Sequence, residues 1–425
     1  MVNAGSYVRR LADVALDDLL VDLPAVALQG AKGVGKTATA RRRAGRTVRF
    51  DVAQERDAFA AAPFDLEPQG TTLLDEWQLH PSSWDQVRRA VDDGAPPGSY
   101  ILAGSSAPPG AHIHSGAGRI VTLRMRPLSL VERGVGEPAV SLSRLLDGGR
   151  GTIRSETPVD LDHYVDEIFG SGFPGLRALP TPRRETWLDG YLSHTVEKEF
   201  AEQGTSVRRP ASLRAWLSAY AAATASTAAY ARILDAATAG ISTKPARDTT
   251  LVYRDVLSRT FVLDPIEAWI PVFNPLKRLT RTPKHFLADP ALVVRLLGLH
   301  REDVRTGRDA ARLDPRSGSM LGPLFEHLVA QSVQVYAQAA GARVGHLRQQ
   351  DGRHEIDLVV ERGRRVVAIE VKLAATVEDR DVRHLVWLRD QLGDDLVDAV
   401  VVTTGPYAYR RRDGIAVVPA ALLGP

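Results

Sequence analysis

Cysteine is absent from all 425 residues of this chain. Its absence excludes disulfide bridges, thiolate-bound zinc and cysteine nucleophiles, so metal binding and catalysis fall to carboxylates, histidines and hydroxyls. The first residues, Met1 to Ser6, also lack the basic-then-apolar layout of a signal peptide. We therefore expect a cytoplasmic protein.

Long apolar runs are missing as well. No uninterrupted run approaches the roughly 18 residues that cross a bilayer, so we expect no membrane-spanning segment and no membrane partner. The hydrophobic content of 44% and the charged content of 25% are typical of globular proteins. The length predicts about two to four domains.

An excess of one charge is also lacking, because the formal net charge is only +3. The pI of about 9.1 and the triplet Arg41–Arg43 leave room for a basic surface that binds nucleic acid. An arginine triplet on a helix is, however, more often a solvated surface. From charge alone, DNA is a candidate partner, and charge does not decide whether it binds.

What the chain does contain is a phosphate-binding loop. Residues 30–37 fit the pattern G-x-x-x-x-G-K-[ST] and follow the apolar run Ala25–Leu28. Glycines let backbone N–H groups turn toward a β-phosphate, Lys36 can reach the β- and γ-phosphate oxygens, and Thr37 can ligate Mg²⁺. The residues predicted to bind ATP are Gly30, Ala31, Lys32, Gly33, Val34, Gly35, Lys36 and Thr37.

A second acidic motif follows at the end of a short apolar run, Thr72–Asp75. In a nucleotide-binding domain Asp75 would hold Mg²⁺ through its water shell, and Glu76 would polarise the attacking water. Ser105 follows the next run and would read the γ-phosphate or orient that water. A serine-rich loop without such a role explains Ser105 equally well.

Five β-like runs with helical stretches between them predict a parallel sheet. These runs cover residues 25–28, 47–51, 72–75, 100–103 and 119–123. Helices are expected after Thr37, through the arginine triplet, and over Ser83–Val91. The first third of the chain is thus predicted to be one nucleotide-binding α/β domain.

The order of these motifs resembles the AAA-type ATPases of bacteria and archaea that carry a C-terminal domain of unknown function. Further matching pieces are residues 74–78, 84–94, 101–106, 117–119, 126–130, 172–175, 188–192, 284–290 and 324–329. The resemblance implies an α/β multidomain protein: an additional-strand P-loop ATPase domain over 1–133, a linker and helical region over 134–205, a winged-helix-like region over 206–300, and a nuclease-like domain over 301–425.

The resemblance also implies two points about single residues. Arg119 is a candidate arginine finger that acts on a neighbouring subunit of a homo-oligomer, although a surface salt bridge is a simpler role for it. Lys32 stands where this family is expected to carry arginine, a change that should leave nucleotide binding intact.

The middle of the chain has helical periodicity over residues 160–200 and 210–240. The piece from Ile241 to Leu263 fits a turn, a second helix and a short wing. Such a unit would face a DNA groove with Ser242, Lys244, Arg247 and Arg254. A protein-packing module is the favoured alternative, because the sequence has no dense basic face here.

A second candidate site lies in the last hundred residues. Asp357 lies in one strand-like run and Glu370-x-Lys372 in the next, where the E-x-K spacing keeps both side chains on one sheet face. This resembles the PD-(D/E)xK nuclease fold, which implies Mg²⁺ on Asp357 and Glu370, Lys372 beside the attacking water, and Glu326 as an outer carboxylate. A degenerate fold that does not cut remains the alternative.

Two classes of function are therefore open. The first is a Mg²⁺-dependent ATPase whose hydrolysis drives the C-terminal module, coupled to cleavage of nucleic acid. The second is an ATP-dependent switch or scaffold for a protein or DNA partner, with a nuclease-like domain that only binds.

Overall fold

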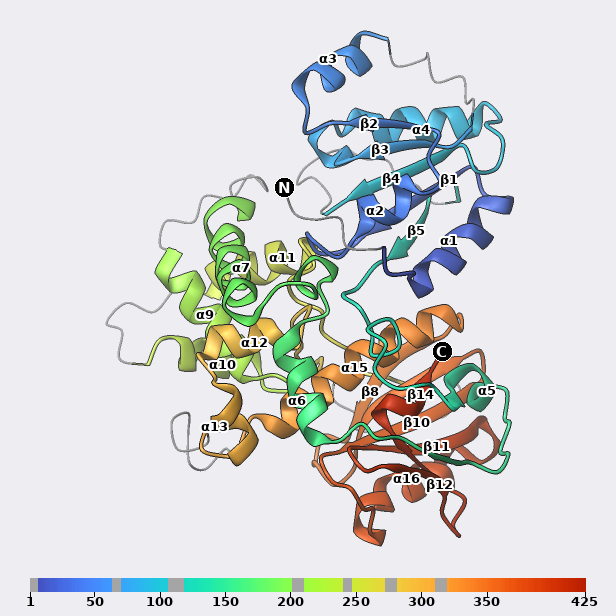
Figure 1. The fold of residues 1–425 in the computed structure, drawn as a ribbon, viewed down its shortest axis with the longest axis vertical. Coiled ribbons are helices and arrows are strands. Elements are labelled where there is room, and N and C mark those ends of the chain that lie inside the picture. The colour runs from blue at the N-terminus through green and yellow to red at the C-terminus, as the bar shows by residue number, and fades with distance from the viewer. Residues whose placement is uncertain are drawn as a thin grey trace.

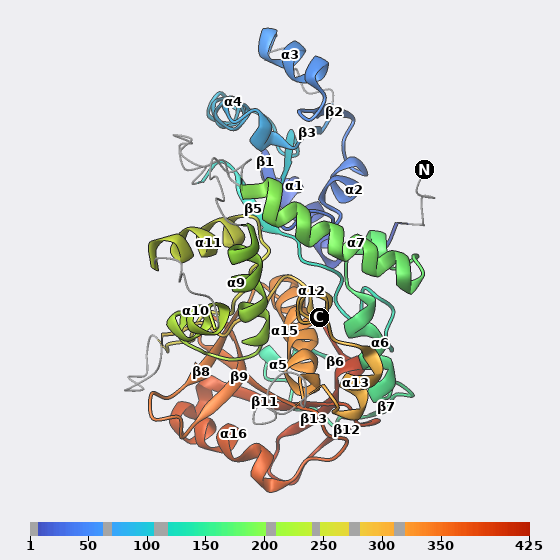
Figure 2. The ribbon, with the colours of Figure 1, turned by 90° about the vertical axis from the view of Figure 1, so that its left-hand side faces the viewer.

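The computed structural model describes residues 7–62, 70–105, 118–200, 210–239, 247–271, 281–309 and 319–425. One β-sheet forms an N-terminal lobe, a second sheet forms a C-terminal lobe, and a layer of helices lies beside and between them (Figures 1 and 2). None of the helices in these ranges has the length and hydropathy of a membrane span.

The N-terminal sheet is parallel throughout and has the order β2-β3-β4-β1-β5. Its strands are β1 (Ala25–Gln29), β2 (Arg46–Arg49), β3 (Thr72–Asp75), β4 (Tyr100–Gly104) and β5 (Val121–Arg124). The predicted five-stranded parallel sheet is thus confirmed. Strand β4 lies between β1 and β3, as the additional-strand arrangement requires.

Helices cover both faces of this sheet, which is why its central strands are mostly apolar and are buried at nearly every position. They are α1 (Leu11–Asp22), α2 (Lys36–Arg41), α3 (Ala53–Ala61) and α4 (Ser82–Asp92). Helix α2 ends within the arginine triplet rather than after it, and Arg42 is its C-cap. Because the strands are parallel, the carboxyl ends of β1, β3 and β4 meet at one edge.

The helical layer contains the helices predicted in the middle of the chain and two that were not predicted. The predicted helices are α6 (Leu161–Gly170), α7 (Thr181–His194), α9 (Pro210–Ala222), α10 (Tyr230–Ala237) and α11 (Arg247–Arg259). The other two are α12 (Pro290–Leu297) and α13 (Arg301–Thr306). Of the proposed DNA-facing residues, Ser242 and Lys244 lie outside the described residues, and Arg247 begins α11. The Arg254 guanidinium lies 4.6 Å from the centre of the Tyr230 ring, so it packs within the layer.

The C-terminal sheet is mixed and has the order β7-β12-β13-β11-β10-β9-β8. Its strands from the last hundred residues are β8 (Arg343–Arg348), β9 (Glu355–Arg362), β10 (Arg365–Lys372), β11 (Leu396–Thr403), β12 (Tyr407–Arg410) and β13 (Ala416–Pro419). Helix α15 (Leu321–Ala339) packs on one face and α16 (Asp379–Leu392) on the other.

The segment expected to be a linker after residue 134 is instead part of this lobe. Strand β7 (Arg154–Glu156) pairs with β12, and β6 (Val140–Ser141) pairs with β14 (Leu423–Gly424). Helix α5 (Leu142–Leu146) lies against β10 and β11. Strands of two or three residues are too short to show an alternating pattern, so they could not be predicted from the sequence.

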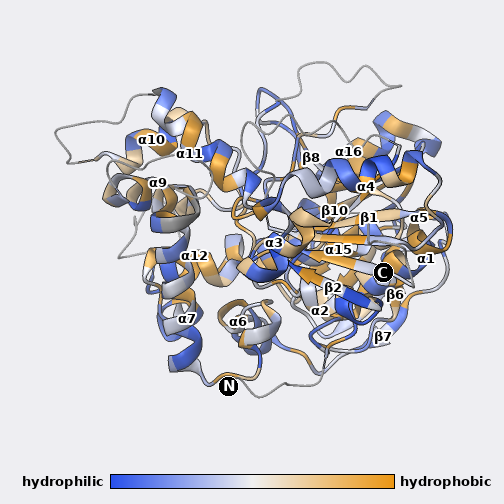
Figure 3. Cartoon of the chain, turned by 90° about the horizontal axis from the view of Figure 1, so that it is seen from above, coloured by the Kyte–Doolittle hydropathy of each residue, from blue (hydrophilic) through white to orange (hydrophobic). Residues whose placement is uncertain are grey.

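One hydrophobic cluster runs through the whole molecule, from Leu16 and Val26 in the N-terminal lobe to Val400 in the C-terminal sheet. Helix α15 is its central element, because it contacts α1, α6, α12 and the C-terminal sheet. Figure 3 shows apolar residues concentrated on the strands and on α15, with polar residues on outward-facing helices. The lobes therefore share a packed core.

Candidate nucleotide-binding site

The phosphate-binding loop follows β1 directly, and its conformation depends on glycine. An added Cβ at Gly30 would lie 2.1 Å from the Met125 carbonyl oxygen, so no side chain fits there. Gly33 and Gly35 have φ angles of 84° and 100°, in the left-handed region that other residues rarely adopt. The glycine pattern thus has a direct geometric cause.

Lys36 lies at the first turn of α2 and is buried. Its ammonium donates to the carbonyl oxygens of Gly30 and Ala31, at 2.8 and 3.0 Å. These two bonds hold the ammonium over the loop. Since these two acceptors are neutral carbonyls, phosphate oxygens can replace them as partners of the ammonium.

Thr37 and Asp75 meet as the sequence predicts. The Thr37 hydroxyl donates to Asp75 Oδ1 at 2.8 Å, and the Arg41 guanidinium lies 3.7 Å from Asp75 Oδ2. Burial raises the pKa of Asp75, and the Thr37 hydrogen bond partly offsets this. A hydroxyl and a carboxylate in contact are hard oxygen donors of the kind that Mg²⁺ prefers, so these two residues fit the ion.

Glu76 and Ser105 also lie at this edge, and Gln78 joins them. The Gln78 amide donates to the Glu76 carboxylate and lies 3.4 Å from Ser105 Oγ. Gly104 leaves room for the Gln78 side chain, because an added Cβ at residue 104 would lie only 2.6 Å from Gln78 Oε1. Sequence reasoning missed Gln78, although its position two residues after Glu76 was visible.

Arg119 lies at the opposite edge of the sheet. It precedes β5, which runs parallel to β1, so it is remote from the phosphate-binding loop of its own chain. Its guanidinium Nε is 2.8 Å from Asp92 Oδ1 at the end of α4. A role as an arginine finger on a neighbouring subunit therefore stays a prediction.

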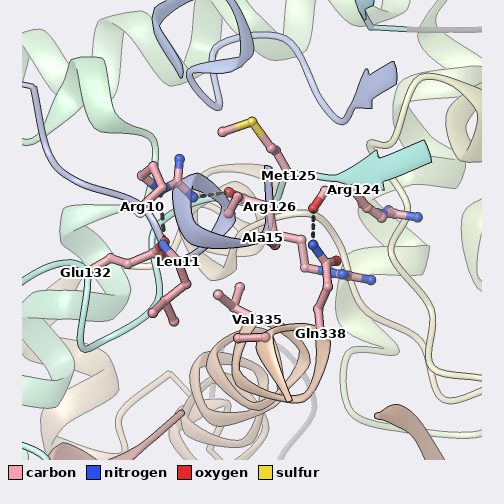
Figure 4. Close-up of a pocket in the computed structure, with 11 residues that line it drawn as sticks. Arg10, Leu11, Ala15, Arg124, Met125, Arg126, Glu132, Val335 and Gln338 are labelled. Carbon is pink, nitrogen blue, oxygen red and sulfur yellow. Dashed lines mark hydrogen bonds and ion pairs between the residues drawn. The ribbon is translucent and has the colours of Figure 1, made fainter. Parts of the chain in front are cut away.

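Arg10 was not predicted from the sequence, yet it links the loop to the rest of the molecule. Its buried guanidinium donates to the Val34 carbonyl at 2.7 Å and to the Arg126 carbonyl at 2.7 Å, and it pairs with Glu132 at 3.0 Å. Figure 4 shows this group beside α15, where Gln338 donates to the Arg124 carbonyl at 2.8 Å. The loop, the end of β5 and α15 are thus connected.

The helical layer also touches the loop. A Cβ added at Gly33 would lie 3.4 Å from the Trp187 ring and 3.6 Å from the Phe173 ring. Trp187 stacks on Tyr191 with ring centres 5.4 Å apart, and its side chain is 36% exposed. Helix α7 thus presents aromatic rings to the turn of the loop.

The predicted residues of the C-terminal lobe converge too. The backbone N–H of Val371 donates to Asp357 Oδ2 at 2.9 Å, which joins β9 to β10. The Lys372 ammonium lies 3.4 Å from Glu370 Oε2. Glu326 of α15 reaches the same cluster through a residue that sequence reasoning missed, Lys284.

Lys284 lies between the carboxylates. Its ammonium is 2.8 Å from Glu326 Oε1, 2.9 Å from Asp357 Oδ1 and 3.8 Å from Glu355 Oε1. Burial opposes its charge, but these carboxylates raise the pKa of Lys284 above its usual value. We call Lys284, Glu326, Asp357, Glu370 and Lys372 the acidic centre.

Ionisation differs among the three carboxyl groups of the acidic centre. Burial opposes the charge of Asp357, yet the Lys284 ammonium holds the pKa of Asp357 well below its usual range. Burial and the charge of Asp357 raise the pKa of Glu326 to about 8. The same two causes raise the pKa of Glu370. The cluster thus carries fewer negative charges than its composition suggests.

This arrangement does not fit the predicted divalent cation. Within the described ranges, no three acidic or histidine side chains are placed to hold a metal ion. Glu326 and Asp357 instead bind the Lys284 ammonium between them. Glu326, Asp357 and Glu370, the residues predicted to bind Mg²⁺, do belong to one cluster. The sequence-based prediction did not include the Lys284 ammonium, which is the cation found there.

Comparison with known families agrees with the N-terminal geometry. Residues 22–133 match a model described as an AAA domain. The N-terminal lobe is thus similar to AAA domains. Residues 161–303 match a domain of unknown function, DUF8612, and residues 321–423 match another, DUF4143. Neither description assigns an activity to the helical layer or the C-terminal lobe.

Two relatives are similar over 97% of this chain and 83% of their own length, each at 28% identity: the uncharacterised proteins Mb2031c of Mycobacterium bovis and Rv2008c of Mycobacterium tuberculosis. Among solved structures, the Walker-type ATPase of Pyrococcus abyssi aligns with 70% of this chain and 97% of its own, at 14% identity and a TM-score of 0.41. The Aeropyrum pernix ORC2 protein aligns with 67% of this chain and 90% of its own, at 15% identity and a TM-score of 0.30.

Proposed function

We propose that this protein binds ATP with Mg²⁺ at residues 30–37, hydrolyses it, and transmits its nucleotide state to the helical layer and the C-terminal lobe. The observation that carries the proposal is the edge shared by the loop, the Thr37–Asp75 pair and the Glu76–Gln78–Ser105 group. Phosphoryl transfer needs a phosphate clamp, a metal anchor and a group that orients water, and this edge supplies all three.

Each side chain has a distinct role in this proposal. Lys36 exchanges its carbonyl partners for phosphate oxygens, and the loop N–H groups complete the clamp. Thr37 and Asp75 would hold Mg²⁺, which neutralises charge on the phosphates when it is bound. Glu76 accepts a proton from the attacking water, while Gln78 keeps the carboxylate turned toward Ser105.

Two contacts support transmission beyond the N-terminal lobe. Arg10 bonds the loop at Val34 and pairs with Glu132. The neighbouring Val131 donates its backbone N–H to the Tyr336 hydroxyl of α15 at 3.2 Å. Trp187 packs on the loop from α7. A shift of the loop on nucleotide binding would therefore reach both α15 and the helical layer.

We favour the switch function over the nuclease for the C-terminal lobe. Lys284 bonds two of the carboxylates that a nuclease would need for metal. A protein or DNA partner and a homo-oligomer that uses Arg119 across subunits belong to the same proposal. DNA cleavage remains the competing function, since the E-x-K pair does lie beside Asp357.

The test is steady-state ATP turnover by the full chain, with Mg²⁺ and with EDTA, in the parent and in Glu76→Gln. We expect turnover to need the metal and to fall by about 10²-fold or more in the variant, while ATP affinity stays within a few fold. Asp93→Asn, at the exposed end of α4, is the matched control and should be unaffected. Unchanged turnover in Glu76→Gln would show that the assigned base is wrong.

A further inference from the structure

Lys284 is held by its backbone as well as by its side chain. Its N–H donates to the Ile266 carbonyl at 2.9 Å, and its own carbonyl accepts from the Ile266 N–H at 3.0 Å. The side chain is only 1% exposed. The ammonium is thus placed from a fixed point of the main chain.

The residues around Lys284 are anchored too. His346 of β8 bonds the Thr282 carbonyl at 2.9 Å, and His327 of α15 bonds the Leu287 carbonyl at 2.8 Å. On the other side, His285 bonds the Ala228 carbonyl at 2.7 Å. Buried side chains therefore hold the segment from Thr282 to Leu287 against both α15 and the C-terminal sheet, and Lys284 cannot leave without breaking these bonds.

The carboxylates around Lys284 come from separate elements. Glu326 belongs to α15, and Asp357 belongs to β9. A buried ammonium is costly unless polar partners compensate it, and here two carboxyl groups lie at hydrogen-bond distance. The cluster thus satisfies Lys284, and Lys284 in turn neutralises the cluster.

A second lysine completes the pairing. Lys372 lies 3.4 Å from Glu370 Oε2, so each lysine has its own carboxylate partner in the acidic centre. A divalent cation would need oxygen ligands at about 2.0–2.6 Å and would lie next to two ammonium groups. Like charges at that range repel strongly in a buried site.

From this geometry we infer that the Lys284 ammonium is a permanent counter-ion of the acidic centre. It binds Asp357, one of the two carboxylates that the nuclease resemblance gives to a divalent cation, and the outer carboxylate Glu326. The C-terminal lobe therefore binds neither Mg²⁺ nor Mn²⁺ and does not cut nucleic acid. This inference concerns the C-terminal lobe alone and does not rest on ATP hydrolysis.

The experiment counts Mn²⁺ bound per full-length chain by electron paramagnetic resonance, with and without ATP. Without nucleotide we expect no saturable Mn²⁺ site, and with ATP we expect one site that Lys36→Ala removes. Lys284→Ala should create a nucleotide-independent site, and adding Asp357→Asn to it should abolish that site. Glu361→Gln, at the other end of β9, is the matched carboxylate control for Asp357→Asn.

The inference is overturned if the parent binds Mn²⁺ without nucleotide, or a second Mn²⁺ with ATP, and Asp357→Asn removes that ion. Mn²⁺-dependent cleavage of DNA by the parent that Asp357→Asn abolishes has the same force. Should Lys284→Ala not fold, the parent and Asp357→Asn still decide the question. Failure of the ATPase proposal is separate, because it appears as an ATP-dependent site that Lys36→Ala leaves intact.

Discussion

The two lobes each place a buried lysine at a sheet edge, but the lysines have different partners. Lys36 bonds two neutral carbonyl oxygens of its own loop. Lys284 bonds carboxylates of two other elements. An ammonium on neutral carbonyls keeps its charge for an incoming anion, whereas an ammonium among carboxylates has already been neutralised. The first site can take a ligand, and the second is complete without one.

This contrast also separates function from stability. A residue whose main partner is a ligand contributes little to the free energy of unfolding, because its bonds in the free protein are weak and exchangeable. A residue that neutralises buried carboxylates contributes much, because its loss leaves uncompensated charge in the core. The same substitution at the two lysines should therefore give opposite results.

Lys36→Met is expected to have the largest effect on activity. Loss of the ammonium removes the phosphate clamp, and we expect ATP turnover to fall by about 10²–10³-fold. The free energy of unfolding should change by only about 1 kcal/mol, because the bonds lost at Gly30 and Ala31 join the ammonium to neutral carbonyls. Turnover assays and chemical denaturation of the same sample measure both quantities. A large loss of stability with normal turnover would contradict the proposed difference between Lys36 and Lys284.

Lys284→Met should do the reverse. Removing the ammonium leaves Glu326 and Asp357 facing each other without a cation, so we expect a loss of about 3–5 kcal/mol in the free energy of unfolding. ATP affinity should stay within a few fold. Lys372→Met is the control, because Lys372 is one-third exposed and pairs at 3.4 Å. It should cost about 1 kcal/mol or less.

The sequence could predict the phosphate site because phosphate binding requires a contiguous pattern. The glycines, Lys36 and Thr37 are within eight residues, and a parallel sheet brings Asp75 to the same edge. Glu370 and Lys372 were predictable for a similar reason, since residues two apart in a strand share a face. Local periodicity is thus enough wherever neighbours in the chain do the chemistry.

The rest could not be predicted, because it depends on contacts between distant residues. Lys284 is 42 positions from Glu326, and Arg10 is 122 positions from Glu132. No spacing rule joins such pairs. The short strands β6 and β7 find their partners more than 200 residues away, near the end of the chain. Only the folded core shows that the expected linker belongs to the C-terminal lobe.

Acid should weaken the contribution that the buried His327 of α15 makes to stability. Burial lowers the pKa of His327 to about 4, against 6.5 for an ordinary histidine. Because the unfolded chain takes up this proton first, the contribution of His327 to the free energy of unfolding is undiminished above pH 6.5 and declines toward pH 4, by about 2 kcal/mol at pH 5. His327→Gln should flatten that decline in pH-dependent denaturation. The exposed His300→Gln is the control, and equal slopes in all three proteins would refute the assignment.

Trp187→Phe should have the smallest effect. It tests whether the fluorescence of Trp187 changes when ATP binds to the phosphate-binding loop. The ring packs on Gly33, so ATP binding should change its surroundings and its fluorescence. Phenylalanine keeps an aromatic contact, and we expect ATP affinity to change by about threefold or less, equal to about 0.7 kcal/mol. The ATP-dependent part of the tryptophan signal should disappear. Trp387 is stacked on His354 in the C-terminal lobe. Trp387→Phe should keep that signal, because it is Trp187 that packs on the loop. A signal lost in Trp387→Phe but kept in Trp187→Phe would place the response in the wrong lobe.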